Sequence, residues 1–246
     1  VSENGMIGVA IGSAINGSKV LVNLQRVEFA LYAFEQIINN AAKTSYISRG
    51  KHNVPIVIRM VIGRGWGQGP THSQSLQSWF VHIPGIKVLA PAFASDYKNL
   101  LNESIKQPGP TIVIEHRWLH ELDSKLIKKR KKTNLANLLS KGKSITIVSY
   151  SYSTIEILQL KEILNKSGVH FDHIDLCSLK PLNYDLIYKS VKKTGKLIIL
   201  DNLSHNICSI GKDIISHLIE RDQKIFKITP KLLTLPEYPS PTSHYL

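Results

Sequence analysis

The feature that most constrains the fold is an alternation of short apolar runs with longer amphipathic stretches. Apolar runs stand at 19–24, 54–62, 86–90 and 111–114, and nearly all of their residues are apolar, as in strands covered on both faces. Between them, 28–46 carries apolar residues at three- and four-residue steps, which predicts a helix. A second helix is predicted over 95–106, with Ser95 as its cap. Together these elements predict an α/β fold with a parallel sheet.

A break follows, and a second series of elements begins after it. From 118 to 143 the apolar period fades and Lys dominates, which is typical of a linker. Strands are then predicted at 144–150, 171–176, 196–200 and 225–228, and helices at 154–166, 184–193 and 207–220. The expected organisation is a domain over 1–117, a Lys-rich linker over 118–143, and a smaller α/β domain over 144–246.

Composition argues against several classes of protein. No apolar run is long enough to span a membrane, and the opening VSENGM lacks the regions of a signal peptide. Cys177 and Cys208 have neither CxxC spacing nor a ligand cluster, so both are expected to be reduced, buried thiols in a cytoplasmic protein. The formal charge of +13 is concentrated in Lys125–Lys132, without aromatic residues for base stacking. That run is interpreted as a solvated linker rather than a nucleic-acid site, with docking to an acidic partner as the alternative.

A glycine-rich loop ending in a histidine is the best candidate for a functional site. In GRGWGQGPTHSQ, glycines alternate along 63–69, Pro70 stiffens the exit, and His72 follows. An imidazole at the mouth of such a loop is suited to proton transfer near neutral pH. The loop does not have the spacing of a phosphate-binding motif, so its residues alone do not identify a cofactor.

The order of motifs identifies a family resemblance. GMIGVAIGSAINGSKVLV, VEFALYAFEQIINNAAKTSYISRG, the loop with THSQ, DLCSLKPLNYDLI and the closing LPEYPSPTS follow one another along the chain. In this order they resemble the β subunit of the 2-oxo acid dehydrogenase decarboxylating component, a pyruvate dehydrogenase-type, transketolase-like thiamine diphosphate enzyme. The resemblance implies a parallel-sheet pyrimidine-binding domain followed by a transketolase C-terminal domain. It also implies that a further β–α unit precedes Val1 in the family.

The same resemblance implies roles for three residues. Glu3, in SEN, matches the glutamate that binds the aminopyrimidine ring of thiamine diphosphate and activates the cofactor. Phe29 matches an aromatic residue that stacks on this ring, whereas Tyr32 is expected to pack in the core. His72, in THSQ, matches the histidine that binds and protonates the substrate carbonyl or the acyl intermediate. Without the resemblance, Glu3 would be interpreted as a solvated charge and Phe29 as core packing.

A partner subunit is implied by what the chain lacks. Enzymes of this kind hold the diphosphate and its magnesium ion with a GDG motif and a later Asn, and no GDG occurs here. The resemblance therefore implies an α subunit that completes the cofactor site in an α2β2 heterotetramer. It further implies oxidative decarboxylation of a 2-oxo acid and acyl transfer to a lipoyl transferase core.

Other candidates are weaker. His82, His116 and His120 lack metal-ligand spacing, so no metal site is assigned, although His116 stands at the strand edge where α/β proteins bind ligands. Arg59 and Arg64, which flank the glycine loop, and Arg26, in LQRVEF, are candidates for substrate, subunit or structural contacts. Two alternative functions remain open: another transketolase-like synthase or transferase, and a truncated subunit without catalytic activity.

Overall fold

The computed structural model describes residues 2–122 and 134–242, which divide into two compact units. The first unit holds the residues up to Leu89, those from Tyr97 onward before the gap, and the C-terminal segment from Tyr238. The second unit holds Ala90–Asp96 and the residues after the gap up to Glu237. The basic run 125–132 lies outside the described residues. Within the described part of the chain, no helix is both long and apolar enough to cross a bilayer.

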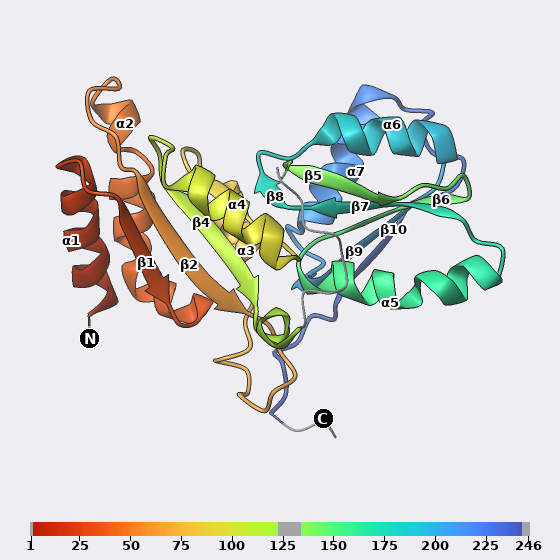
Figure 1. Ribbon diagram of the computed structural model, residues 1–246, viewed down its shortest axis with the longest axis horizontal. Helices are drawn as coiled ribbons and strands as arrows, with labels where there is room; N and C mark the ends of the chain where they lie inside the picture. Colours follow the sequence, from red (N-terminus) through yellow and green to blue (C-terminus); the bar gives the residue numbers. More distant parts are fainter. Residues whose placement is uncertain (1, 123–133, 243–246) are drawn as a thin grey trace. The chain divides into compact units, whose positions relative to one another are not determined.

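The helices and strands of the first series alternate as predicted (Figure 1). In chain order they are α1 (Glu3–Ile15), β1 (Val20–Leu24), η1 (Val27–Ala33), η2 (Gln36–Ala41), α2 (Thr44–Ile47), β2 (Ile56–Ile62), α3 (Gln77–His82), β3 (Lys87–Leu89), α4 (Ala94–Ser104), β4 (Thr111–His116) and η3 (Arg117–Glu121). The strands of the first unit lie in the order β1-β2-β4-β3, and every pair is parallel. The predicted parallel α/β fold is confirmed.

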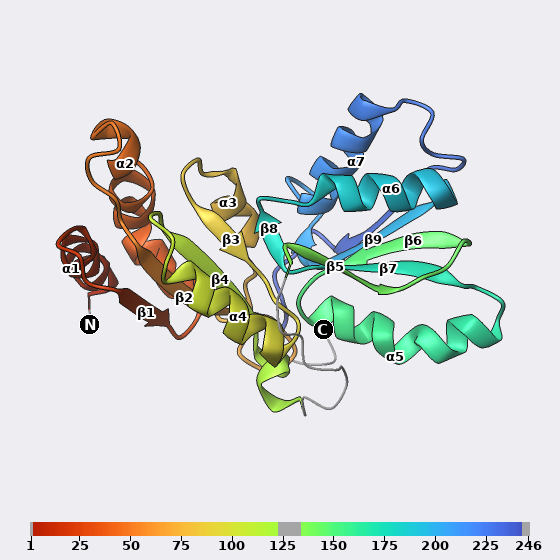
Figure 2. The ribbon, with the colours of Figure 1, turned by 45° about the horizontal axis from the view of Figure 1, so that its top comes forward.

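Burial follows the position of each strand in this sheet. All six residues of β4 are buried, as expected for an inner strand covered on both faces. β1 lies at the edge and alternates instead: Val22 and Leu24 are buried, whereas Leu21 and Asn23 are exposed. Helix α1 packs on η1, β1 and β2, and α4 crosses in front of β4 in both ribbon views (Figure 2).

The helix predicted over 28–46 is helical but broken into three kinds of turn. It runs as a 3-10 segment, a π segment and a short α-helix. Val27, Ala30 and Ala33 are buried at three-residue steps, which is the period of a 3-10 helix, and their small side chains allow close approach to α1 and β2. Tyr32 is 71% exposed, so its predicted place in the core is wrong.

The second unit is built around a separate sheet. Its elements are β5 (Ala136–Ser140), β6 (Ile145–Ser149), α5 (Tyr152–Lys166), β7 (Phe171–Leu176), β8 (Ser178–Lys180), α6 (Tyr184–Thr194), β9 (Leu197–His205), α7 (Ile210–Arg221) and β10 (Lys231–Leu235). The order in the sheet is β10-β9-β6-β7-β5, parallel except for β5 against β7.

Two features of this unit differ from the sequence-based expectations. The last strand is β10, not 225–228: Ile225 is buried in a turn, and KLLTL provides the strand that pairs with β9. Strand β5 lies within the stretch 118–143 that was expected to be a linker. Its pairing with β7 explains this, because a partner strand far along the chain leaves no local periodic signal.

Candidate active site

The predicted site residues come from segments at one edge of the first sheet. In a parallel sheet the carboxyl ends of the strands meet at the same edge, where α/β proteins bind ligands. β1 ends at Leu24 and η1 follows it, whereas β2 ends at Ile62 and the glycine loop follows it. Figure 1 shows the N-terminus of α1 on the side toward which the arrowheads of β1 and β2 point. Glu3, Phe29 and His72 therefore belong to segments that begin at this edge.

His72 is held by a buried carboxylate that sequence reasoning missed. Its Nδ1 lies 2.6 Å from Oε1 of Glu28, and the Glu28 residue is only 6% exposed. The His72 side chain is 41% exposed, so the imidazole stands between a buried acid and solvent. An ionised carboxylate can only accept, so with Glu28 ionised the hydrogen bond requires a proton on Nδ1 and leaves Nε2 to exchange protons with a ligand. This is the arrangement of a histidine positioned for general acid and base chemistry.

The main chain of His72 is also fixed. The guanidinium of Arg26 donates to the His72 carbonyl at 3.1 Å and to Oε1 of Gln68 at 2.7 Å. Arg26 precedes η1 and Gln68 lies in the glycine loop, so this one side chain links the two segments that carry Glu28 and His72. After His72, the Gln74 side chain donates to the Thr71 carbonyl at 3.0 Å, and helix α3 begins only at Gln77.

The ring of Phe29 lies near the imidazole of His72. Their ring centroids are 6.1 Å apart with an interplanar angle of 47°. Phe29 is partly exposed, whereas its neighbours Glu28 and Ala30 are buried. The 3-10 segment thus turns the carboxylate inward and leaves the phenyl ring accessible at the same edge.

Glu3 begins helix α1 and keeps its carboxylate unpaired. Ser2 caps the helix through a hydrogen bond from the Gly5 N–H, and Asn4 accepts one from Gln36, which ties this first turn to η2. Within residues 2–122 and 134–242, the Glu3 carboxylate makes no hydrogen bond or ion pair with another side chain. The structure brings Phe29 and His72 together, whereas Glu3 reaches this edge on a separate helix and, among the described residues, forms no hydrogen bond or ion pair with His72.

Gly63, in the glycine loop, requires glycine both for its backbone conformation and for the space around it. Its φ is +121°, and a Cβ there would lie 2.6 Å from Nε2 of His116. His116 is 1% exposed and packs between the rings of Trp66 and Trp118. Burial lowers the pKa of His116 to about 3, with the charge of Arg64 acting in the same direction. His116 is therefore a neutral support of the loop rather than a side chain open to ligands.

Arg59, another weaker candidate, has a structural role. It forms a two-pronged ion pair with Glu115, at 2.7 and 3.0 Å, from the neighbouring strand β4. This pairing raises the pKa of Arg59, although partial burial opposes it. His120 donates to or accepts from the second oxygen of Glu115 at 3.0 Å.

Among the described residues, one group has the composition of a metal site, and it belongs to the second unit. Donor atoms of Asp96, Asp175 and Cys177 lie within 4.8 Å of one another, and all three residues are buried. Asn137 donates to the Cys177 sulfur at 3.0 Å, and Thr154 donates to Asp175 at 2.7 Å. Cys177 is thus a buried thiol as expected, whereas Cys208 is exposed and contradicts that expectation.

Comparison with known proteins places the two halves of the chain in related families. Residues 1–121 match the model of the transketolase pyrimidine-binding domain, and residues 134–246 match the transketolase C-terminal domain. The β subunit of acetoin:2,6-dichlorophenolindophenol oxidoreductase from Cupriavidus necator is 34% identical over 99% of this chain and 72% of its own length. The pyruvate dehydrogenase E1 β subunit of Rhizobium meliloti is 32% identical over 96% of this chain and 53% of its own length. The chain belongs to the transketolase-like family of E1 β subunits.

Other E1 β relatives agree with this assignment. The mitochondrial pyruvate dehydrogenase E1 β-2 subunit of Oryza sativa is 35% identical over 89% of this chain and 60% of its own length. The chain therefore spans little more than half the length of several E1 β relatives that it matches. Among solved structures, a split-gene transketolase in an inactive β4 tetramer has the same fold, with a TM-score of 0.79 and 20% identity over 96% of this chain and 73% of that one.

The sequence carried one signal for the missed residue Glu28. It stands directly before Phe29 in VEFALY, an acidic side chain at the start of an otherwise apolar segment. A buried acid in such a position needs a partner, because an isolated charge in the protein interior is costly. The sequence does not identify His72 as that partner, since the pairing depends on the adjacency of β1 and β2.

Proposed function

We propose that this E1 β-type chain contributes the pyrimidine side of a thiamine diphosphate site in a 2-oxo acid dehydrogenase. The reaction would be oxidative decarboxylation of a 2-oxo acid with transfer of the acyl group to a lipoyl group. The observation that carries the proposal is the pairing of His72 with buried Glu28 next to Phe29, at the carboxyl edge of a pyrimidine-binding domain. Family membership supports the choice of cofactor.

The side chains at this edge fit the aminopyrimidine half of the cofactor. Glu3 offers an unpaired carboxylate, and Phe29 offers a partly exposed ring of the kind on which a heteroaromatic ring stacks. The family resemblance, with no GDG motif in this sequence, supports an α subunit that would hold the diphosphate and its magnesium ion.

Each residue then has a defined task. When bound, thiamine diphosphate would supply a carbon nucleophile for the 2-oxo carbonyl and accept the electron pair released with carbon dioxide. Glu3 would share a proton with the pyrimidine ring nitrogen, and Phe29 would stack on that ring. His72 delivers a proton from Nε2 to the substrate oxygen, while Glu28 keeps the imidazole oriented and supports its positive charge.

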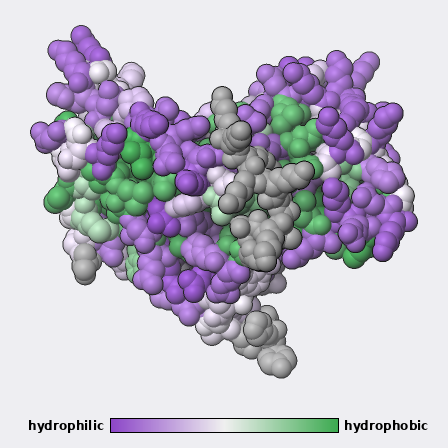
Figure 3. Space-filling model, in the orientation of Figure 1, coloured by the Kyte–Doolittle hydropathy of each residue, from purple (hydrophilic) through white to green (hydrophobic). Residues whose placement is uncertain are grey.

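An exposed apolar surface supports the proposal that the chain contacts other subunits. Figure 3 shows apolar side chains gathered over the region of α1 and β1, where Val9, Ile15 and Leu21 are 76, 40 and 41% exposed. Large apolar side chains exposed in one region are typical of surfaces that contact other proteins. It supports the proposed α2β2 heterotetramer, with attachment to a lipoyl transferase core as the next level. The cytoplasmic location stays a prediction, and the rice relative is named as mitochondrial.

The decisive experiment is reconstitution with an α-type E1 subunit. Decarboxylation should require both subunits and thiamine diphosphate, and Glu3→Gln should abolish it while the urea unfolding midpoint stays unchanged. Glu35→Gln is the matched control, because Glu35 is an exposed glutamate on a neighbouring turn. Near-normal turnover by Glu3→Gln would overturn the assignment. Turnover of sugar phosphates instead of 2-oxo acids would favour a transketolase-like synthase, and loss of cofactor binding in every reconstitution would favour a non-catalytic subunit.

A further inference from the structure

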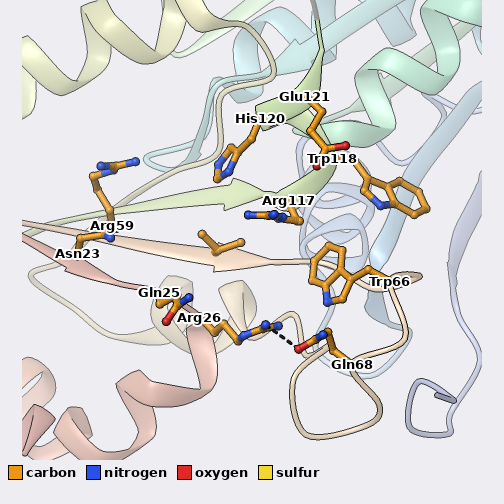
Figure 4. A pocket seen from close by; sticks show the side chains of 11 residues that line it. Asn23, Gln25, Arg26, Arg59, Trp66, Gln68, Arg117, Trp118, His120 and Glu121 are labelled. Carbon is orange, nitrogen blue, oxygen red and sulfur yellow. Dashed lines mark hydrogen bonds between the residues drawn. The ribbon is translucent and has the colours of Figure 1, made fainter. Parts of the chain in front are cut away.

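A polar pocket of about 490 Å³ lies beside the glycine loop. Phe29 and His72 are not among the residues that line it. Three arginines line it, Arg26, Arg59 and Arg117, together with Gln68 and the indole rings of Trp66 and Trp118 (Figure 4). All of these residues belong to the first unit, so the pocket is a property of that unit alone. Its volume is within the usual range for small-molecule sites.

The three arginines differ in how their charge is balanced. Arg59 is paired with Glu115 by two hydrogen bonds, so its charge is neutralised locally. Arg26 donates only to neutral acceptors, the Gln68 side chain and the His72 carbonyl. Arg117 is exposed and, within the described residues, makes neither a hydrogen bond nor an ion pair.

The remaining charges in the lining leave the pocket cationic. Glu121 is the acidic residue that lines it, against the unneutralised Arg26 and Arg117.

We propose that this pocket binds the oxyanion group, a phosphate or a carboxylate, of a small molecule. Guanidinium groups match the geometry of both oxyanions and bind them by paired N–H donors. Arg26 and Arg117 supply the charge, and the side-chain amide of Gln68 supplies neutral N–H donors. The two tryptophans give the pocket flat walls for the rest of the molecule.

Occupation of the pocket is coupled to the position of His72. Arg26 lines the pocket and also donates to the His72 carbonyl, so a ligand that draws its guanidinium changes the contact that fixes this backbone. An effect of this coupling on catalysis depends on the proposed function of His72. Binding of an anion in the pocket does not depend on it. The pocket thus fits either a second acidic group of the substrate or an anionic effector.

Binding is tested on the full chain without cofactor or α subunit, at constant ionic strength. Inorganic phosphate and succinate, a dicarboxylate, are titrated separately by calorimetry and by tryptophan fluorescence, since two of the three tryptophans in the chain line the pocket. We expect saturable binding of one of them with a Kd near ~1 mM. The anion that binds more tightly identifies the chemistry as phosphate or carboxylate.

Variants locate the site. Arg117→Gln should raise the Kd about tenfold, since a charged hydrogen bond contributes ~1.5 kcal/mol or more. Arg64→Gln is the matched control, because it removes the same charge from an exposed arginine of the glycine loop that does not line the pocket. Equal weakening by both variants would mean nonspecific attraction and would overturn the proposal. No saturable binding of either anion to the unmodified chain would also overturn it, and would leave the test of Glu3 in the reconstituted enzyme unaffected.

Discussion

The carboxylate of Glu28 lies 2.6 Å from Nδ1 of His72, although 44 residues separate them in the sequence. The acid is almost completely buried and the imidazole is partly exposed, so one partner fixes the other at the surface of the cleft. A histidine whose Nδ1 is held in this way has a single tautomer and a single ring orientation. Glu28 is therefore a positioning residue for whatever proton transfer His72 carries out.

Replacing Glu28 by glutamine tests this positioning. Glu28→Gln retains the shape of the side chain but removes the charge that supports a protonated imidazole. In the reconstituted enzyme we expect kcat to fall roughly tenfold to a hundredfold with KM changed less than twofold. Glu35→Gln, the exposed control, should leave both constants unchanged. A rise in KM with unchanged kcat would indicate that Glu28 serves substrate binding instead.

Phe29 is expected to determine cofactor affinity. Phe29→Ala removes the ring that stands 6.1 Å from His72 and should weaken thiamine diphosphate binding about tenfold, since loss of an aromatic stack costs ~1 kcal/mol or more. Tyr32→Ala provides a control, because Tyr32 lies on the same 3-10 segment and is 71% exposed. Calorimetric titration of the cofactor into the assembled subunits is the measurement. Equal affinities of the two variants for thiamine diphosphate would contradict the role of Phe29 in binding the cofactor.

Gly63 should tolerate no side chain. Gly63→Ala introduces a Cβ at a φ of +121° and at 2.6 Å from the buried His116 ring. The strained backbone and the overlap together should lower the free energy of unfolding by about 2 to 4 kcal/mol. Gly12→Ala is the contrasting case, because nothing lies within 4 Å of its added Cβ in helix α1. This second variant should be neutral or stabilising by ~0.5–1 kcal/mol. Urea unfolding midpoints of the two variants provide the comparison.

Acid should destabilise the chain through its buried histidines. Burial lowers the pKa of His116 to about 3 and that of His173 to about 4, both from the ordinary 6.5. The unfolded chain therefore binds protons that the folded chain does not, and stability falls as pH drops below 6.5 toward these values. Each histidine should cost ~1 kcal/mol by pH 5.5.

Urea unfolding at pH 7.5 and 5.5 measures this effect. His116→Gln and His173→Gln should each reduce the pH dependence, whereas His52→Gln, at an exposed position, should not. If the stability of the unmodified chain were the same at both pH values, the neutral, buried state of these histidines would be contradicted.

The local pattern of the sequence determined most secondary elements and the class of the fold. Runs such as Ile56–Ile62 and Thr111–His116 are apolar throughout because both faces of an inner parallel strand are covered. Motif order also gave the family, since the loop with His72 and the segment with Phe29 keep their places along the chain. These properties depend on neighbouring residues, so the sequence carries them directly.

Only the tertiary structure decided which distant side chains meet. The pairing of Glu28 with His72, the link from Arg26 to the His72 carbonyl and the cationic pocket all arise because β1 and β2 lie side by side. The break of the expected long helix into 3-10 and π turns has the same origin, because close packing of small residues against α1 outweighs the helical preference of the segment. Strand β10 was misplaced because pairing with β9, not local hydrophobicity, selects its residues. Contacts across the chain depend on strand order and burial, which no short window of sequence contains.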